Sequence, residues 1–297
     1  MAFILLQYFV KEIDKEKSIK EIIKREFKLS NRLFTKLKNN KAIMHNSNIA
    51  MVNQIPKIGD KITILVEENS NNSHIIKPQE EKLDIIFEDD YLIAINKEQN
   101  IVVHPCSYHP DNTLSNFLLG YLNKYKKVTK VHPINRLDRG TSGIVLFAKN
   151  EYVQEQYKKL NEIPKKEYIA LVYGKFKGEE LEGIIDAPIS RKEDSIIERK
   201  VDFENGKKAI TNYKVIKQYK IKDIDVSVLK LIIKTGRTHQ IRVHLSYINH
   251  PIIGDTLYNH IENFGYENQL LHSYMLSFLH PITKKEITLK TDLPNWI

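Results

Sequence analysis

The first part of the chain shows two hydrophobic patterns, short apolar runs typical of strands and apolar residues at helical spacing. The run FILLQYFV (3–10) is short and rich in strand-forming residues, so it predicts a strand. In SIKEIIKREF (18–27) the apolar residues recur at helical spacing between charged ones, which predicts an amphipathic helix. Ser30 is a favourable N-cap for a second helix, and KITILV (61–66) predicts a further strand after a Gly-Asp turn. The second helix presents an apolar stripe of Leu33, Phe34 and Leu37.

Beyond residue 82 the pattern becomes a series of short apolar runs with few helices between them. Runs around Ile85 and over 92–95, separated by acidic turn residues, predict a hairpin. The segment 114–125 predicts a helix capped by the polar residues before it. Strands and helices do not alternate regularly, so the pattern favours an α+β fold over a doubly wound one. The other predicted elements are strands over 144–150, 165–176, 209–215, 226–234 and 286–289 and a helix over 150–160.

A change in composition separates the two patterns. The segment ENSNNSHIIKPQEE (68–81) is polar and rich in Asn and Ser, which is typical of a linker. A chain of 297 residues has room for one large domain and one small domain. We therefore expect a small α/β domain over 1–68, a linker over 69–82 and a large α+β domain over 83–297.

The charge of the chain points to a polyanionic partner. Lys and Arg number 46 and Asp and Glu 37, which gives a formal net charge of +9. Such an excess is typical of proteins that bind nucleic acid. The alternative is coding bias. The chain is also rich in Ile and Asn, and AT-rich genes raise the lysine content of a protein whether or not the charge has a function.

Compartment and membrane association can also be addressed from the sequence. The only cysteine, Cys106, excludes an internal disulfide and a thiolate cluster, and it favours the cytoplasm. The start MAFILLQYF has no basic leader and no small-residue cleavage site, so we interpret it as a strand and not a signal peptide. No stretch approaches the roughly 18–20 apolar residues of a membrane span. We expect a cytoplasmic monomer without a membrane partner.

Common cofactor and catalytic motifs are missing. The chain has no GxGxxG after a strand, no GxxxxGK phosphate loop, no HExxH and no GxSxG. His239 and His244 are five residues apart with no acid nearby, which does not suit a metal site. We expect no cofactor and no metal, and we interpret both histidines as structural, hydrogen-bonded residues of a sheet.

The segment INRLDRGTSG (134–143) concentrates charge in a tight turn ahead of a hydrophobic strand. Asp138 stands between Arg136 and Arg139, and glycines follow. An exposed ion pair in a turn would contribute at most about 1 kcal/mol and would need no such arrangement. Thr141 to Gly143 have the composition of turn-forming residues that direct the acid.

Four segments together resemble the RluA-type pseudouridine synthases. INRLDRGTSG fits the family pattern HRLDxxTSG, and residues 166–174 fit KxYxALVxG. Residues 235–258 fit TGRxHQIRxHL followed by HPIxGDxxY, and LHSYMLSFLHP fits LHAxxLxFxHP with Ser273 in place of Ala. Their order and spacing agree across 83–297. The resemblance implies a catalytic domain built on a large mixed, mainly antiparallel sheet with a central cleft. It also implies an enzyme that acts on uridine in structured RNA and needs no cofactor.

Two departures from the family pattern lie near the acid. Asn135 stands where His often precedes the Arg-Leu-Asp, and Glu98 and Asn100 stand where the family usually has Pro and Gly. Asn tolerates a left-handed backbone better than other residues that carry a side chain, so we expect the turn at Asn100 to form. These departures bear on substrate choice more than on catalysis.

The resemblance also implies roles for individual residues. Asp138 would be the essential carboxylate, either as a nucleophile at the anomeric carbon or as a base on the ribose. Arg237 would be its ion-pair partner and Tyr168 would stack on the target uracil. Arg136 would displace the flipped nucleotide, and Arg242 would contact substrate. The alternatives are a turn ion pair for Asp138, a place in the core or on the sheet surface for Tyr168, and simple phosphate contacts for Arg237 and Arg242.

The N-terminal region resembles the αL-type RNA-binding domain named after a small-subunit ribosomal protein. Ser30 with Arg32, and Gly59 with Asp60, match its two short motifs. Arg32 and Lys36 on the second helix would then contact RNA; the alternative is a basic helix with a solvated face. Family members with such a domain favour large-subunit ribosomal RNA over transfer RNA as the substrate.

Two competing functions belong to other classes. An RNA-binding or ribosome-assembly factor could keep the fold without activity, although the presence of Asp138, Tyr168 and Arg237 speaks against this. A hydrolase using Asp138 lacks the paired acid that glycoside cleavage needs. The leading hypothesis is an RNA pseudouridine synthase with its catalytic domain over 83–297.

Overall fold

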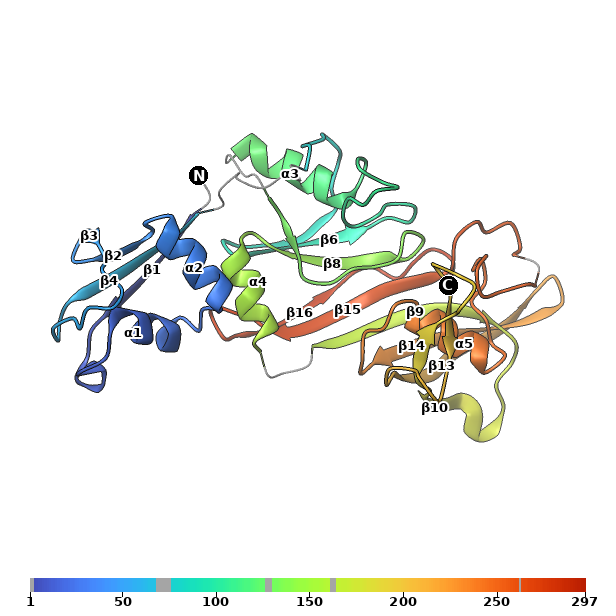
Figure 1. Ribbon diagram of the computed structural model, residues 1–297. Coiled ribbons are helices and arrows are strands. Elements are labelled where there is room, and N and C mark those ends of the chain that lie inside the picture. The colour runs from blue at the N-terminus through green and yellow to red at the C-terminus, as the bar shows by residue number, and fades with distance from the viewer. Residues whose placement is uncertain (1–2, 68–75, 126–129, 161–163, 262) are drawn as a thin grey trace.

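The computed structural model describes residues 3–67, 76–125, 130–160, 164–261 and 263–297. These residues form a four-stranded sheet with two helices at the N-terminal end and a much larger sheet of ten strands in the rest of the chain (Figure 1). The α+β fold class predicted from the sequence is confirmed. No helix in these described ranges has the length and apolar content needed to cross a membrane.

The N-terminal sheet has the strand order β1-β4-β2-β3 with all neighbours antiparallel. Both predicted helices are present and begin at serine caps. Ser18 accepts from the backbone N–H of Glu21, and Ser30 accepts from that of Leu33. The elements are β1 (Phe3–Phe9), a 3-10 turn at Glu12–Asp14, α1 (Ile19–Glu26), α2 (Asn31–Asn39), β2 (Ile43–His45), β3 (Asn48–Ile49) and β4 (Lys61–Glu67).

The large sheet has the order β10-β13-β14-β9-β15-β8-β6-β5, with β16 beside β15 and β7 beside β8. The predicted hairpin is the antiparallel pair β5 and β6. The strands are β5 (Ile85–Glu88), β6 (Leu92–Lys97), β7 (His132–Pro133), β8 (Ser142–Ala148), β9 (Lys165–Tyr173), β10 (Glu182–Asp186), β13 (Ile210–Ile221), β14 (Ile224–Ile233), β15 (Leu271–Leu279) and β16 (Glu286–Lys290). The helices are α3 (Leu114–Tyr125), α4 (Glu151–Lys158), α5 (Gln240–Tyr247) and a 3-10 turn at Gly178–Leu181.

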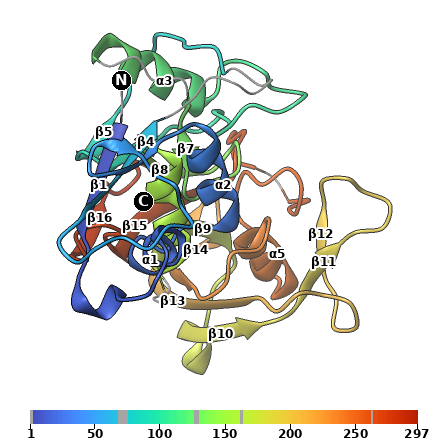
Figure 2. The ribbon, with the colours of Figure 1, turned by 60° about the vertical axis from the view of Figure 1, so that its left-hand side comes forward.

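A separate hairpin projects beside α5 at the edge of the molecule (Figure 2). It consists of β11 (Ile189–Arg191) and β12 (Arg199–Val201), which pair antiparallel. Arg199, the first residue of β12, is connected to the N-terminus of α5 through Tyr258, whose hydroxyl accepts from the Arg199 backbone N–H and lies 2.9 Å from Nδ1 of His239, the N-cap of α5.

The two halves of the large sheet meet at one short seam. β8 and β15 run parallel and pair through only two residue pairs, His272 with Ser142 and Ser273 with Gly143. Gly143 has a φ of +107°, and a Cβ there would lie 2.3 Å from the backbone oxygen of Ser273. Only glycine fits both the conformation and the close approach. The INRLDRGTSG turn therefore enters the sheet where its two halves join.

Helix α5 is an element that the sequence pattern did not predict. We expected His239 and His244 in a sheet, but residues 240–247 are helical, and that expectation is wrong. Ile241 and Leu245, one helical turn apart, pack into the core of the β9–β14 half. Tertiary burial of this face outweighs the weak helix preference of its β-branched residues.

The N-terminal region contacts the large domain through α2 and α4, which lie side by side (Figure 1). The Glu155 carboxylate accepts from the backbone N–H and the hydroxyl of Ser30, each at 2.5 Å. Lys36 forms an ion pair with Glu151 at 2.6 Å. Apolar residues from both regions, including those of α1, α2, β6 and β8, belong to one buried cluster.

Residues 69–75 of the predicted linker lie outside the described residues. The remaining part, 76–82, runs against the start of α3. The backbone N–H of Gln79 donates to the carbonyl of Asn116 at 3.0 Å, and its side chain exchanges hydrogen bonds with Asn112. The domain boundaries at 68 and 83 stay predictions.

Candidate active site

The turn that carries Asp138 is held from several sides. The N–H of Thr141 donates to the Asp138 carbonyl at 3.1 Å, and Gln269 donates to the Thr141 hydroxyl at 3.0 Å. The Ser142 hydroxyl and Nδ1 of His272 are hydrogen-bonded at 2.8 Å across the seam. Residues from the second half of the sheet thus fix the turn, which limits how far Asp138 can move.

Lys97 stabilises the same turn through a hydrogen bond to its backbone. It ends β6, it is 1% exposed, and its Nζ donates to the carbonyls of Arg139 at 3.2 Å and Glu98 at 2.7 Å. Burial lowers the pKa of Lys97 to about 7, and the negative charge of Asp138 opposes part of that shift. This residue ties the buried strand to the backbone beside the acid.

The two departures from the family pattern have local explanations. The Asn135 side chain donates to the carbonyl of Ile144 at 3.0 Å and accepts from the N–H of Leu146 at 2.7 Å, which aligns the turn with β8. Asn100 adopts the left-handed backbone expected of it, with a φ of +65°. Both asparagines supply backbone geometry at these positions, and neither replaces the acid.

Arg242, the third residue of α5, is the cation that faces Asp138. Its Nη1 donates to Oδ2 of Asp138 at 3.1 Å. Its Nε and Nη2 donate to both oxygens of Asp255 at 2.7 Å each, and Asp255 is fully buried. Burial alone would lower the pKa of Arg242, but the hydrogen bonds and charges of Asp255 and Asp138 raise it. The arginine therefore bridges two carboxylates and stays charged.

The expectation that Arg237 pairs with Asp138 is wrong. Arg237 lies in the turn before α5, where its Nε donates to the carbonyl of Lys208 at 3.0 Å. Arg242, which we had expected to contact substrate, takes the place beside the acid because α5 carries it against Asp255. The sequence stretch was the right one, but the choice between its two arginines depended on a helix that was not predicted.

A cleft of about 830 Å³ opens at these residues. A smaller pocket of about 80 Å³ shares five of the predicted site residues with it. These five predicted residues are Arg136, Asp138, Tyr168, Arg237 and Arg242. The fold thus brings together, at one cavity, all of the site residues predicted in the large domain. A carboxylate, an aromatic ring and three guanidinium groups suit a ligand that carries both a base and phosphates.

Tyr168 lies in β9 opposite Ser273 of β15. Its side chain is buried, and the residue still lines the cavity. Burial raises the pKa of Tyr168 to about 12, and the nearby Asp138 carboxylate adds to the shift. The phenol is therefore neutral at ordinary pH and fixed in place next to the acid.

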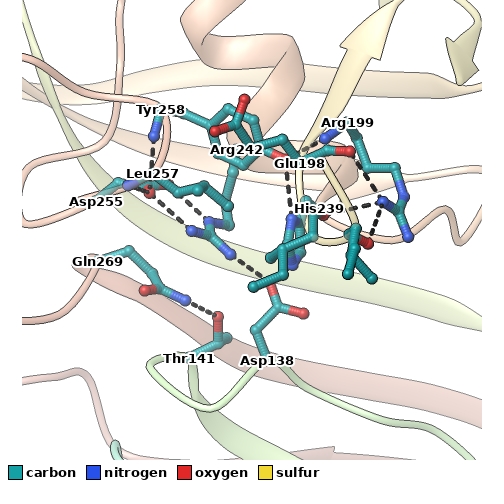
Figure 3. Close-up of polar contacts among 12 residues, drawn as sticks. Asp138, Thr141, Glu198, Arg199, His239, Arg242, Asp255, Leu257, Tyr258 and Gln269 are labelled. Carbon is teal, nitrogen blue, oxygen red and sulfur yellow. Dashed lines mark hydrogen bonds and ion pairs between the residues drawn. The ribbon is translucent and has the colours of Figure 1, made fainter. Parts of the chain in front are cut away.

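Three residues of the site were not assigned to it from the sequence: His239, Asp255 and Tyr258. His239 caps α5 with a left-handed backbone, φ 57°. Its Nε2 lies 3.8 Å from Oδ2 of Asp138, and its Nδ1 lies 2.9 Å from the hydroxyl of Tyr258 (Figure 3). The spacing of His239 and Arg242, three residues apart, would have placed both on one helical face had the helix been recognised.

The predicted RNA-contacting residues of the N-terminal region are far from this cluster in the fold. The Arg32 side chain is 86% exposed, with its Nε 4.0 Å from Glu151. Lys36 is engaged with the same glutamate. A contact of either residue with RNA stays a prediction.

The chain is similar in sequence and in fold to known proteins. The family described as RNA pseudouridylate synthase matches residues 91–247. The chain is 36% identical over 274 residues to the uncharacterized RNA pseudouridine synthase YjbO of Bacillus subtilis, covering 91% of this chain and 93% of the relative. It is 33% identical over 276 residues to the ribosomal large subunit pseudouridine synthase D of Blochmanniella floridana, covering 86% and 84%. Among solved structures, human RNA pseudouridylate synthase domain containing 1 aligns with a TM-score of 0.60 and 25% identity, over 72% of this chain and 84% of that chain. The chain therefore belongs to the RNA pseudouridylate synthase family and is an RNA pseudouridine synthase, an isomerase.

Proposed function

We propose that Asp138 is the reactive carboxylate and that Arg242 is its ion-pair partner. The observation that carries this proposal is the 3.1 Å contact between Arg242 and Asp138 at the cavity, with Arg242 itself fixed by the buried Asp255. Charge-assisted hydrogen bonds of this kind are short and directional, so they hold a carboxylate in one orientation.

The reaction breaks the bond between the ribose anomeric carbon and N1 of uracil and forms a bond from that carbon to C5. The hydrogen on C5 leaves as a proton and N1 takes up a proton, so the product is an isomer of the substrate. Asp138 acts at the ribose, as a nucleophile on the anomeric carbon or as a base on the sugar. Tyr168, which lines the same cavity as Asp138, stacks on the uracil, and its hydroxyl assists removal of the proton from C5.

A uridine in folded RNA must leave its stack to reach this cavity, which costs a few kcal/mol. Arg136 is exposed at the mouth of the cleft, and we assign it to the space that the extruded base leaves. Arg237 also faces the cleft, with its Nε engaged by a backbone carbonyl, and we assign it to the RNA backbone.

We propose large-subunit ribosomal RNA as the substrate. Relatives named ribosomal large subunit pseudouridine synthase D are 33–34% identical to this chain, and one of them aligns over 86% of it. Arg32, on the exposed face of α2, is the N-terminal residue best placed to contact the same RNA outside the cleft.

The Asp138→Asn variant tests the assignment. The probe is deproteinised large-subunit ribosomal RNA from cells that lack the protein, with tritium on C5 of uridine. The variant should bind this RNA as the wild type does and release no tritium above background. Asp292→Asn, an exposed acid, is the matched control and should keep full activity.

Two outcomes would contradict the proposal. Undiminished tritium release by Asp138→Asn would remove Asp138 from the chemistry. RNA binding without tritium release by the wild type, on total cellular RNA, would favour the inactive RNA-binding factor.

A further inference from the structure

Two donors face the same oxygen of Asp138. Arg242 lies 3.1 Å from Oδ2, and Nε2 of His239 lies 3.8 Å from it. Within the described part of the chain, no side chain donates a hydrogen bond to Oδ1, which points away from Arg242 (Figure 3). What His239 does there depends on which of its ring nitrogens carries the proton.

The Tyr258 hydroxyl determines which ring nitrogen of His239 carries the proton. The backbone N–H of Arg199, in β12, donates to that hydroxyl at 2.8 Å. The hydroxyl proton is then available for Nδ1 of His239, 2.9 Å away. If Nδ1 accepts, the imidazole proton of the neutral ring must be on Nε2, where it points toward the carboxylate.

The opposite arrangement is unfavourable at both ends. An Nε2 lone pair would face the negatively charged Oδ2, which is repulsive. The Tyr258 hydroxyl would receive two donors and leave its own proton without a partner among the described residues. Burial lowers the pKa of His239, an effect that Asp138 opposes and that Arg242 and Arg199 reinforce, so the ring is neutral.

Tyr258 also contacts the other donor. The guanidinium carbon of Arg242 lies 5.1 Å from the centre of the Tyr258 ring, within the range of a cation–π interaction. One aromatic side chain thus packs against one donor to Asp138 and hydrogen-bonds to the other. Through Arg199, the same side chain connects the site to the β11–β12 hairpin.

We propose that His239 is a positioning residue that directs its Nε2–H at Oδ2 of Asp138, and that Tyr258 selects this tautomer. With Oδ2 hydrogen-bonded to Arg242 and faced by the Nε2–H of His239, Oδ1 is the oxygen that reacts. The inference rests on the proposed function of Asp138, but the tautomer itself can be observed without turnover.

The first experiment is nitrogen-15 NMR of the full-length protein labelled at histidine, at pH 7.5. Two other histidines, one buried and one half-buried, serve as internal references because backbone carbonyls fix their tautomers. His244 donates from Nε2 to the carbonyl of Ala187, and His250 donates from Nδ1 to the carbonyl of Tyr173. His239, assigned by its loss in His239→Gln, should match the His244 pattern. In Tyr258→Phe, which keeps the ring and removes only the hydroxyl, it should shift toward the His250 pattern.

The second experiment measures single-turnover tritium release and RNA affinity separately. His239→Asn keeps a residue that tolerates the left-handed backbone but is too short to reach Asp138. Its rate should fall about tenfold or more, as for other residues that orient a reacting group, with RNA affinity within about twofold of the wild type. His239→Gln, whose amide extends further, should recover part of the rate.

An Nδ1–H tautomer in the wild type, or an unchanged rate in His239→Asn, would overturn the inference. Failure of the proposed function looks different: Asp138→Asn would stay active while the His239 tautomer remained Nε2–H.

Discussion

Two polar clusters hold functional parts of this enzyme in place, and they differ in burial. At the active site, Arg242 and Asp255 are 8% and 0% exposed in their side chains and meet through two 2.7 Å contacts. At the junction of α2 and α4, Lys36 and Glu151 are 31% and 21% exposed. The first cluster cannot lose a member without leaving an uncompensated charge, whereas water can replace a partner in the second. The buried Arg242–Asp255 pair therefore holds the active site rigidly, whereas the half-exposed Lys36–Glu151 pair lets the N-terminal region shift more easily.

Among the variants that test this comparison, Asp255→Asn should cause the largest loss of stability and of activity. It keeps the shape of the side chain but removes the charge that holds Arg242, so we expect a loss of about 3 kcal/mol in the free energy of unfolding. Arg242 would also lose its fixed direction, and the single-turnover rate should fall about a hundredfold. Urea unfolding and tritium release measure the two effects. Unchanged values for both would mean that Asp255 does not position Arg242.

Lys97→Met should have a smaller, pH-dependent effect. The pKa of Lys97 is about 7 in the folded protein and near 10.5 when exposed. Between these values the unfolded chain holds a proton that the folded one has released, so raising the pH favours the folded state. The wild type should gain about 2 kcal/mol relative to Lys97→Met between pH 7 and pH 9. Urea unfolding at both values checks this, and a difference that stays constant or shrinks would contradict the buried position of Lys97.

Glu155→Gln at the α2–α4 junction should have the smallest effect. The amide keeps one acceptor for Ser30 but loses the favourable charge at the N-terminus of α2. We expect a loss of about 1 kcal/mol or less and an unchanged single-turnover rate. Thermal unfolding and tritium release, with Asp255→Asn measured alongside, provide the comparison. A loss of rate comparable to that of Asp255→Asn would mean that the junction is coupled to catalysis.

Much of the fold followed from local patterns. Helix α1, helix α2 with its capping Ser30, the β5–β6 hairpin and α3 were predicted from periodicity and turn residues. Helix α5 was not, because its β-branched residues and its left-handed cap resemble a strand and a turn until the face it buries is known. Its stability comes from packing against β-strands that are distant in sequence.

The site was predictable to a similar degree. Asp138 and Tyr168 stand out through a resemblance to family motifs, and the fold brings both to one cavity. The partner of Asp138 was misidentified because Arg237 and Arg242 share one short segment and only the helix distinguishes them. Asp255, 13 residues beyond Arg242, could be recognised as its anchor only in three dimensions.

The most direct measurement of the central claim compares Arg242→Gln with Arg237→Gln. Both lose one guanidinium at the same cavity, so each serves as the control for the other. Single-turnover tritium release should fall about a hundredfold or more in Arg242→Gln, as expected when a charged group at a reacting centre is removed. In Arg237→Gln the rate should stay within about threefold, and RNA affinity should weaken instead. The reverse pattern, with chemistry lost in Arg237→Gln and kept in Arg242→Gln, would contradict the account.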